Sequence, residues 1–212
     1  YPAIYGPRQP NPMDWSVIKR VLDGREFIIL PDSGLTLTAR CAARNAAEHL
    51  LLALDKPAQS RNQVYNCVDD DQFTLRQWME LVSACAGRKL AMLSLPQELA
   101  APAEALTRQL DSANHCMLDG AKARRELGYR DVVPARQALA DTVAWYLENP
   151  VTAAEYPSFP DPFDYAAEDR LVAAYRAGIA DIQARAPFVR PTYHHSYAHP
   201  KKPGEGPDHR GR

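Results

Sequence analysis

The sequence has 212 residues, of which 46% are hydrophobic and 24% are charged, and its formal net charge is -1 at pH 7. This composition is that of an ordinary globular protein, and the small net charge provides no overall field to attract nucleic acid or an anionic membrane. No apolar run reaches the roughly 18 residues that a membrane-spanning helix needs, and the sequence does not open with a secretion signal. We therefore expect a soluble, cytoplasmic protein.

The cysteines follow neither a CxxC pattern nor the dense spacing of a disulfide-bonded scaffold. They are Cys41, Cys67, Cys85 and Cys116. Because thiols with such irregular spacing usually behave as small apolar residues, we predict that they are reduced and buried.

Strand and helix patterns alternate along the first 150 residues, which indicates an α/β fold. The expected strands cover residues 1–5, 26–30, 63–68 and 90–95. A short helix is expected from residue 12. The other expected helices cover residues 43–54, 74–86, 96–109, 120–127 and 134–148. The short helix is predicted from Asn11 as N-cap, Pro12 at the first helical position and Asp14 facing the helix dipole.

The best-marked helix start lies at Thr74, because Thr74 and Gln77 have the spacing of a capping box. Phe73 and Trp78 flank it with the spacing of a hydrophobic staple. Farther along, Gly128 is a typical helix stop.

The composition changes after residue 150. Three prolines stand close together at 157, 160 and 162, and a helical pattern follows over about 166–184. From residue 187 the chain is rich in proline and poor in aliphatic side chains. Such a segment buries too little apolar surface to order itself, so we expect a disordered tail.

Several short segments, taken in order, resemble the C-terminal half of the extended short-chain dehydrogenase/reductase family, also called NAD-dependent epimerase/dehydratases. The segments are Tyr1-Pro2-Ala3-Ile4-Tyr5-Gly6-Pro7-Arg8, Arg40, Ala43-Arg44-Asn45-Ala46-Ala47, Val64-Tyr65-Asn66, Thr74-Leu75, and Asp119-Gly120-Ala121-Lys122-Ala123 with Leu127-Gly128. No segment is specific alone; the order and spacing over residues 1–148 carry the resemblance.

The resemblance implies the C-terminal part of a Rossmann-like α/β fold with a mixed α/β substrate lobe, followed by a C-terminal helix and the tail. We expect residues 1–10 to end a truncated Rossmann domain and residues 11–150 to form mainly the substrate lobe, with returning Rossmann elements. Residues 151–186 would form a C-terminal extension with a helix, and 187–212 the disordered tail.

Two family motifs are absent from the sequence: the Gly-rich G-x-G-x-x-G or G-x-x-G-x-x-G turn that binds a dinucleotide, and the catalytic Y-x-x-x-K pair. In the family both motifs precede the point at which this sequence begins. We therefore expect a substrate-lobe fragment of an NAD(P)-dependent epimerase/dehydratase-like oxidoreductase that acts on a nucleotide sugar or a related hydroxyl or carbonyl substrate. NAD or NADP would be bound mainly by the missing half, so the chain alone should bind it poorly and not catalyse hydride transfer.

The resemblance also assigns candidate site residues. Tyr1 and Pro2 match positions that lie against the nicotinamide ring in the family, although simple strand packing is the alternative. Arg40 and Arg108 match arginines that reach toward a substrate diphosphate, and Arg8 is a weaker candidate of the same kind.

Arg40 and Arg8 also have plainer interpretations. Arg40 is alternatively a surface cation neutralised by Asp32 or Glu48, and Arg8 an exposed loop charge. Ala3 stands where sugar-nucleotide epimerases often have a hydrogen-bonding Asn. Because of this departure, a competing hypothesis is an extended short-chain reductase or dehydrogenase that acts on a non-nucleotide substrate. A further alternative is a non-catalytic scaffold or binding protein with the same fold.

Within the tail, the stretch 194–199 contains three histidines, His194, His195 and His199, in a proline-rich setting. Imidazole is a common metal ligand, but this segment offers no rigid element to orient it, so we predict no specific metal site. The expected partners are a small-molecule substrate and possibly a second copy in a homodimer, with no nucleic acid and no membrane.

Overall fold

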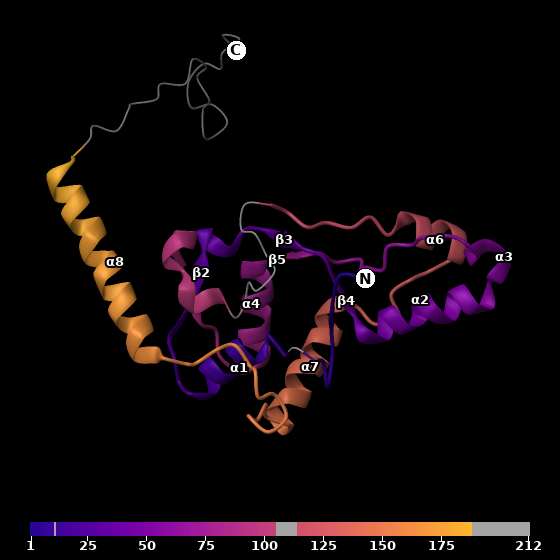
Figure 1. The fold of residues 1–212 in the computed structure, drawn as a ribbon, viewed down its shortest axis with the longest axis horizontal. Helices are drawn as coiled ribbons and strands as arrows, with labels where there is room; N and C mark the ends of the chain where they lie inside the picture. The colour runs from indigo at the N-terminus through magenta and orange to yellow at the C-terminus, as the bar shows by residue number, and fades with distance from the viewer. Residues whose placement is uncertain (11, 105–113, 188–212) are drawn as a thin grey trace, which may run out of the picture. The chain divides into compact units, whose positions relative to one another are not determined.

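The computed structural model describes residues 1–10, 12–104 and 114–187. The chain divides into two units, Tyr1–Tyr165 and Ala166–Arg212. Every strand of the described residues lies in the first unit, together with most of the helices (Figure 1).

Three two-stranded sheets form among the described residues of the first unit. Two of them are parallel: β1 (Ala3–Tyr5) with β4 (Arg40–Ala42), and β2 (Phe27–Pro31) with β6 (Ala91–Leu95). The third is antiparallel and joins β3 (Leu37–Thr38) to β5 (Phe73–Thr74). In the first sheet Ala3 lies opposite Arg40, which brings the start of the chain beside the segment that leads into α2.

The helices of the first unit gather in two groups (Figure 1). One group packs α1 (Trp15–Leu22), α4 (Leu75–Cys85) and α7 (Ala135–Glu148) against one another. The other joins α2 (Ala43–Asp55), α3 (Pro57–Ser60) and α6 (Ala121–Leu127). Short 3-10 turns occur at η1 (Asp32–Gly34), η2 (Gln97–Leu99) and η3 (Ala101–Ala103).

The predicted start of α4 is confirmed in full. Thr74 accepts from the backbone N–H of Gln77 at 3.2 Å, while the Gln77 side chain accepts from the backbone N–H of Thr74 at 2.9 Å. The rings of Phe73 and Trp78 pack with their centroids 6.0 Å apart, which is the staple contact. These local contacts fix the entry of the chain into the helix that carries Trp78 to the core.

Trp78 is the centre of the core of the first unit. Its ring is 1% exposed and meets the Tyr5 ring edge-on, with a centroid distance of 4.8 Å. Other large side chains of the first unit are also almost fully buried: Ile18, Ile28, Leu30, Met79, Leu95, Leu127, Tyr129, Leu139 and Tyr146. The buried interior extends to the group α2, α3 and α6, where Tyr129 stacks on His49.

A buried polar network ties β1, β4 and α2 to the segment before α7. The Asp69 carboxylate accepts hydrogen bonds from the Tyr5 hydroxyl at 2.8 Å and from the Asn45 amide at 2.8 Å. The Ala42 N–H donates to both of its oxygens, at 3.0 and 3.1 Å. Burial and the Asp69 carboxylate raise the pKa of Tyr5 above its ordinary value, so Tyr5 stays a neutral donor.

Residues 150–165 pack back on the start of the chain. Arg20 of α1 donates to Asp161 at 2.5 Å, and both side chains are almost fully buried. The Tyr156 hydroxyl donates to the backbone carbonyl of Gln9 at 3.3 Å. This segment is therefore attached to the loop between β1 and α1.

The described part of the second unit is essentially one helix, α8 (Tyr165–Arg185), which agrees with the predicted helix over 166–184. Asp181 and Arg185 form an i,i+4 pair on it, 2.7 Å apart. The predicted disordered tail lies outside the described residues from 188 onward.

Other expectations need correction. The first helix begins at Trp15 rather than Pro12, after a turn in which Trp15 N–H donates to the Pro12 carbonyl. Residues 63–68 form no strand. Where a helix was expected from residue 96, residues 97–103 contain short 3-10 turns; Glu104 is helical, and residues 105–109 lie outside the described residues. Cys85 and Cys116 are exposed, whereas the other two cysteines are buried as predicted.

None of the helices in the described part of the chain combines the length and apolar character that crossing a bilayer requires.

Candidate functional site

The first unit contains a cavity of about 480 Å³ beside β1. This volume falls within the range of small-molecule sites. Its walls come from β1, the loop before α1, and the extended segment that joins β3 to β4. The lining residues include Tyr1, Pro2, Ala3, Gln9, Met13, Asp14, Thr38, Arg40 and Cys116. We call this the β1 cavity.

Arg40 supplies the positive charge of the β1 cavity. It is the first residue of β4 and only 9% exposed, and its guanidinium lies over the Trp78 ring at 4.5 Å from the centroid. The aromatic face offsets part of the cost of burying the cation. Nevertheless, the Nε and Nη2 atoms of Arg40 are buried with no hydrogen-bond partner among the described residues, and burial lowers the pKa of the group.

Thr38 lies two residues before Arg40 in an extended segment, so both side chains point to the same side of the chain. Its hydroxyl is buried and also has no partner among the described residues. The backbone around it is fixed by Cys116, whose carbonyl accepts from the Ala39 N–H at 2.7 Å and whose N–H donates to Leu37 at 2.9 Å. The segment carrying Cys116 thus closes one side of the cavity.

Asp14 supplies the negative charge of the cavity. It is 4% exposed and accepts a hydrogen bond from the Trp78 indole N–H at 2.7 Å. Burial raises the pKa of Asp14 above its ordinary value, against the opposing effects of Arg40 and of the indole hydrogen bond. The Asp14 charge also contributes to the raised pKa of Tyr146 of α7, for which burial is the main cause.

The mouth of the cavity is formed by the first residues of the chain. Tyr1 is 68% exposed, and Pro2 and Ala3 follow it along the same wall. Burial raises the pKa of the Tyr1 phenol above its ordinary value, with smaller contributions from Cys67 and Cys41. The two sides of the cavity therefore differ: an apolar, partly open strand faces a buried pair of charges.

A thiol pair lies on the other face of β4. The sulfur atoms of Cys41 and Cys67 are 3.3 Å apart and buried. The hydrogen bond between the thiols, together with nearby His49, lowers the pKa of Cys67 to about 6. His49 itself stacks on Tyr129 with ring centroids 3.6 Å apart, so the pair is part of the packed interior.

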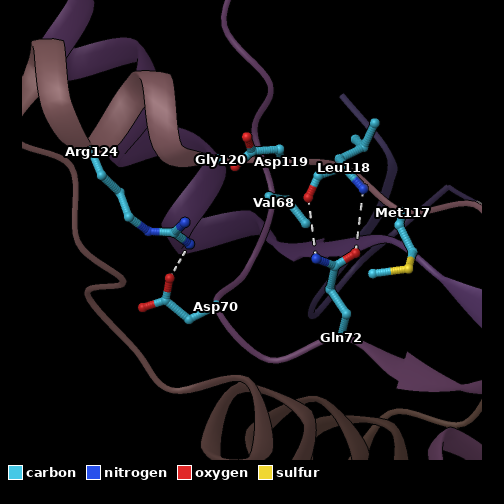
Figure 2. A pocket seen from close by; sticks show the side chains of 8 residues that line it. All are labelled: Val68, Asp70, Gln72, Met117, Leu118, Asp119, Gly120 and Arg124. Carbon is cyan, nitrogen blue, oxygen red and sulfur yellow. Dashed lines mark hydrogen bonds and ion pairs between the residues drawn. The ribbon is translucent and has the colours of Figure 1, made fainter.

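Figure 2 shows a second cavity of about 380 Å³, between the loop after Val68 and residues 117–120. Its polar groups satisfy one another. Arg124 forms an ion pair with Asp70, and the Gln72 amide donates to the Leu118 carbonyl at 3.1 Å and accepts from the Leu118 N–H at 3.3 Å (Figure 2). Because its charges and amides already have partners, this cavity offers a ligand less than the β1 cavity does.

Three of the five predicted site residues meet at the β1 cavity: Tyr1, Pro2 and Arg40. Arg8 is exposed on the turn after β1, with φ 61°, and does not line the cavity. Arg108 lies outside the described residues. The carboxyl group that acts on Arg40 is that of Asp14, rather than Asp32 or Glu48 as the plainer interpretation of the sequence assumed.

Sequence reasoning missed Asp14 and Thr38. Asp14 has the signature of a helix-start acid, and its burial depends on Trp78, 64 residues away. Thr38 carried one available signal, its i,i+2 spacing from Arg40 in a β-prone segment. Within the described ranges, no cluster of three or more His, Cys, Asp or Glu side chains has metal-binding geometry, and His194, His195 and His199 fall outside those ranges.

No protein-family model matches the chain, and no curated protein matches it either. Solved structures do match its fold. UDP-glucose 4-epimerase from Thermotoga maritima, determined with UDP-glucose, is 22% identical with a TM-score of 0.53, over 70% of this chain and 45% of the epimerase.

Two further structures give the same picture. dTDP-glucose 4,6-dehydratase from Streptomyces venezuelae, with NAD bound, is 24% identical with a TM-score of 0.52, over 70% of this chain and 42% of that enzyme. UDP-glucuronic acid 4-epimerase from Bacillus cereus, with UDP-glucuronic acid and NAD, is 16% identical with a TM-score of 0.56, over 70% of this chain and 44% of that enzyme. The expected resemblance in fold is thus confirmed, and the chain spans less than half the length of these structures.

Proposed function

We propose that the chain forms the substrate side of an NAD(P)-dependent epimerase/dehydratase-like oxidoreductase, which acts on a hydroxyl or carbonyl substrate. The observation that carries the proposal is the β1 cavity, where the Tyr1–Pro2 wall faces the buried Arg40. The similarity in fold to epimerases and dehydratases whose structures contain NAD supports the same proposal. Fold alone does not fix chemistry, so the cavity is the stronger argument.

The residues at the cavity mouth fit a nicotinamide ring. Tyr1 is largely exposed and Pro2 is apolar, so the two offer an open surface against which a flat ring can stack. When bound there, the nicotinamide supplies a hydride acceptor or donor. The role of Tyr1 and Pro2 is to position the ring beside the cavity and to keep water from that face. The pyrophosphate would be held by other residues, since the sequence contains no Gly-rich turn.

Arg40 and Ala3 bear on the substrate. Arg40 lines the cavity, and its guanidinium favours a substrate with an anionic group. Ala3 lines the same cavity without any hydrogen-bonding group. This feature favours the finer proposal that the substrate is not a standard nucleotide sugar, although nucleotide sugars remain the ligands of the similar structures.

The first unit also has a surface suited to a nucleotide-binding half. Among the described residues, β1 is hydrogen-bonded to β4 alone, which leaves its other edge open. On α2, Leu50, Leu51 and Leu54 are 56%, 56% and 75% exposed. A continuing α/β unit would cover both an open parallel edge and exposed leucines. We propose that a nucleotide-binding half packs there, whether in the same polypeptide or in another.

The test is cofactor binding by the complete natural protein, including any coding sequence that precedes Tyr1. NADH and NADPH are titrated separately while nucleotide fluorescence is followed. We expect saturable binding of one of them, weakened several-fold by Tyr1→Ala because the ring loses its stacking surface. The control is Tyr65→Ala, since Tyr65 bonds Gln59 and Glu126 away from the cavity.

Absence of binding for both nucleotides would reject the oxidoreductase and leave a non-catalytic binding protein with the same fold. Equal weakening by the Tyr1 and Tyr65 variants would reject the place assigned to Tyr1.

A further inference from the structure

Two thiols of the first unit lie side by side although they are far apart in the sequence. The sulfur atoms of Cys41 and Cys67 are 3.3 Å apart, and the two residues are separated by 26 positions. Cys41 is the middle residue of β4, and the Asp69 N–H, two residues after Cys67, donates to the Arg40 carbonyl at 3.0 Å. A disulfide needs the sulfurs to approach to about 2.05 Å, which requires only a small shift of one segment.

The segment that carries Cys67 is able to make this shift. Residues 63–68 form no strand, Asn66 is exposed, and Cys67 itself is 3% exposed. On the other side, Ile4 lies opposite Cys41 in the sheet of β1 and β4 and is 38% exposed. The pair is thus buried beneath exposed neighbours. Because a segment without a regular ladder opens at low cost, a small solute reaches Cys67 without unfolding of the core.

The surroundings of the two thiols give them different chemical character. The hydrogen bond from Cys41, together with His49, lowers the pKa of Cys67, whereas the same bond and burial raise the pKa of Cys41. Both ring nitrogens of His49 are buried with no other hydrogen-bond partner among the described residues, and stacking on Tyr129 holds the ring. Since the thiolate is the reactive form of cysteine, Cys67 is the nucleophile of the pair.

We propose that Cys41 and Cys67 form a redox modification site, at which a peroxide converts the two thiols into a reversible disulfide. Cys67 reacts with the peroxide, and Cys41 resolves the product. The inference does not depend on the proposed function, because it involves neither a dinucleotide nor a substrate.

The reaction has two steps. In the first, His49 takes the Cys67 proton and the thiolate sulfur attacks one oxygen of hydrogen peroxide. An S–O bond forms, the O–O bond breaks, and the leaving hydroxide takes the proton back from His49 to become water. In the second, the Cys41 sulfur attacks the sulfenic acid on Cys67. An S–S bond forms, the S–O bond breaks, and the leaving hydroxide takes the Cys41 proton. The two thiols thus lose two electrons, and the peroxide is reduced to two waters.

The experiment exposes the protein to hydrogen peroxide in a background of Cys85→Ser and Cys116→Ser, which removes the two exposed thiols. We expect Cys41 and Cys67 to become protected from alkylation after unfolding, and peptide mapping to find them cross-linked within one chain. Dithiothreitol should restore both thiols. Oxidation of Cys85 in the parent chain shows that the peroxide dose is sufficient. If Cys41 and Cys67 stayed open to alkylation at that dose, the proposal would be overturned.

Single serine substitutions in the same background separate the two roles. In Cys41→Ser, the Cys67 sulfenic acid has no thiol partner, so we expect dimedone, added together with the denaturant, to trap it. In Cys67→Ser, we expect no adduct on Cys41. An adduct that forms on Cys41 as readily as on Cys67 would contradict the assignment of the nucleophile.

His49→Phe tests the residue that takes the proton. The new side chain keeps an aromatic ring against Tyr129 and removes the base. We expect several-fold slower disulfide formation, with circular dichroism recorded to confirm that the reduced protein is folded. An unchanged rate would remove His49 from the reaction.

A disulfide between the two cysteines would enclose α2 and α3, which lie between them in the sequence. Because the cross-link restricts the unfolded chain, we expect peroxide to raise the melting temperature by several degrees and dithiothreitol to reverse the rise. Reversal distinguishes the disulfide from oxidised methionine, which dithiothreitol leaves in place. Cys67→Ser should show no such reversible rise. A reversible rise in that variant would show that the pair is not its cause.

Discussion

Trp78 shows how a single residue can organise both stability and a binding site. One face of the indole carries the Arg40 guanidinium, the N–H holds Asp14, and the edge-on Tyr5 ring links it to β1. The positions of both cavity charges are therefore determined by the same core residue. A cation and a carboxylate are kept close to each other without touching.

Asp14 makes the stability of the chain depend on pH. Because its pKa is raised in the folded state, the folded protein binds a proton more readily than the unfolded one. The unfavourable burial of the carboxylate is fully present above the raised pKa, and it is relieved as pH falls toward the ordinary Asp value of about 4.

We therefore expect Asp14→Asn to have a larger free energy of unfolding than the parent chain at pH 8, and the difference to shrink as pH falls toward 4. Urea denaturation at several pH values measures it. Asp71→Asn, at an exposed carboxyl group, is the control for the change in net charge. A difference that does not vary with pH would contradict the assignment.

Asn45 is the most heavily bonded side chain of the buried network. Its NH₂ group donates to Asp69 at 2.8 Å and to the Val133 carbonyl at 3.0 Å, and its oxygen accepts from the N–H groups of Val132 and Val133 at 3.0 and 3.1 Å. All the usual bonds of an amide are thus made.

Asn45→Ala should lower the free energy of unfolding by roughly 3 kcal/mol, because each buried group left without a partner costs about 1–3 kcal/mol. Urea denaturation measures the change. Asn66→Ala is the control: this exposed residue donates a single bond, to the Asp119 carbonyl, so we expect a loss below about 1 kcal/mol. Similar losses for the two variants would show that the network adds nothing beyond an ordinary hydrogen bond.

At the scale of elements, α4 depends on its first turn to present Trp78 correctly. We expect Thr74→Ala to destabilise the chain by about 1 kcal/mol, since the N3 amide loses its capping acceptor. Thermal unfolding measures the change. The control is Thr152→Ala. The exposed Thr152 hydroxyl accepts from the Glu155 N–H at 3.4 Å in a turn outside any helix, so its loss should lower the free energy of unfolding by less. A larger loss for Thr152→Ala would contradict the role of the capping box.

The capping box also shows which elements the sequence predicts well. The start of α4 and the αL stop of α6 at Gly128 depend on residues within a few positions of one another, and both were predicted correctly. The segment 63–68 has a strand-like composition but forms no regular ladder; only its continuation is tied to β4, through the Asp69 N–H and the Arg40 carbonyl. Composition indicates that a strand is possible, while pairing depends on distant neighbours.

The candidate site divides in the same way. Tyr1, Pro2 and Arg40 were found because their order along the chain resembles a known pattern. Asp14 was missed because its local sequence favours a helix start, and only tertiary packing on Trp78 makes it a cavity residue.

At the scale of the whole first unit, the buried Arg20–Asp161 pair joins α1 to the segment after α7. Removing one partner of such a pair leaves the other buried without its closest countercharge. Asp161→Asn should therefore lower the free energy of unfolding by about 3 kcal/mol or more, as measured by urea denaturation.

The comparison is with the exposed i,i+4 pair of Lys19 and Asp23, 2.7 Å apart on the same helix. Lys19→Met should cost no more than about 0.5 kcal/mol, since water screens this pair. If the two substitutions lowered the free energy of unfolding by the same amount, the buried pair would not hold the segment after α7.

The hydrogen bond from Tyr156 to Gln9 has a consequence for how the β1 cavity and the segment after α7 influence each other. Gln9 lines the β1 cavity, and Pro10 lines both that cavity and a smaller one of about 230 Å³ against Tyr156 and Pro157. The same short loop is thus a wall of two compartments. A displacement of Pro10 would therefore alter the boundary of both cavities at once, next to a segment almost 150 positions later in the chain.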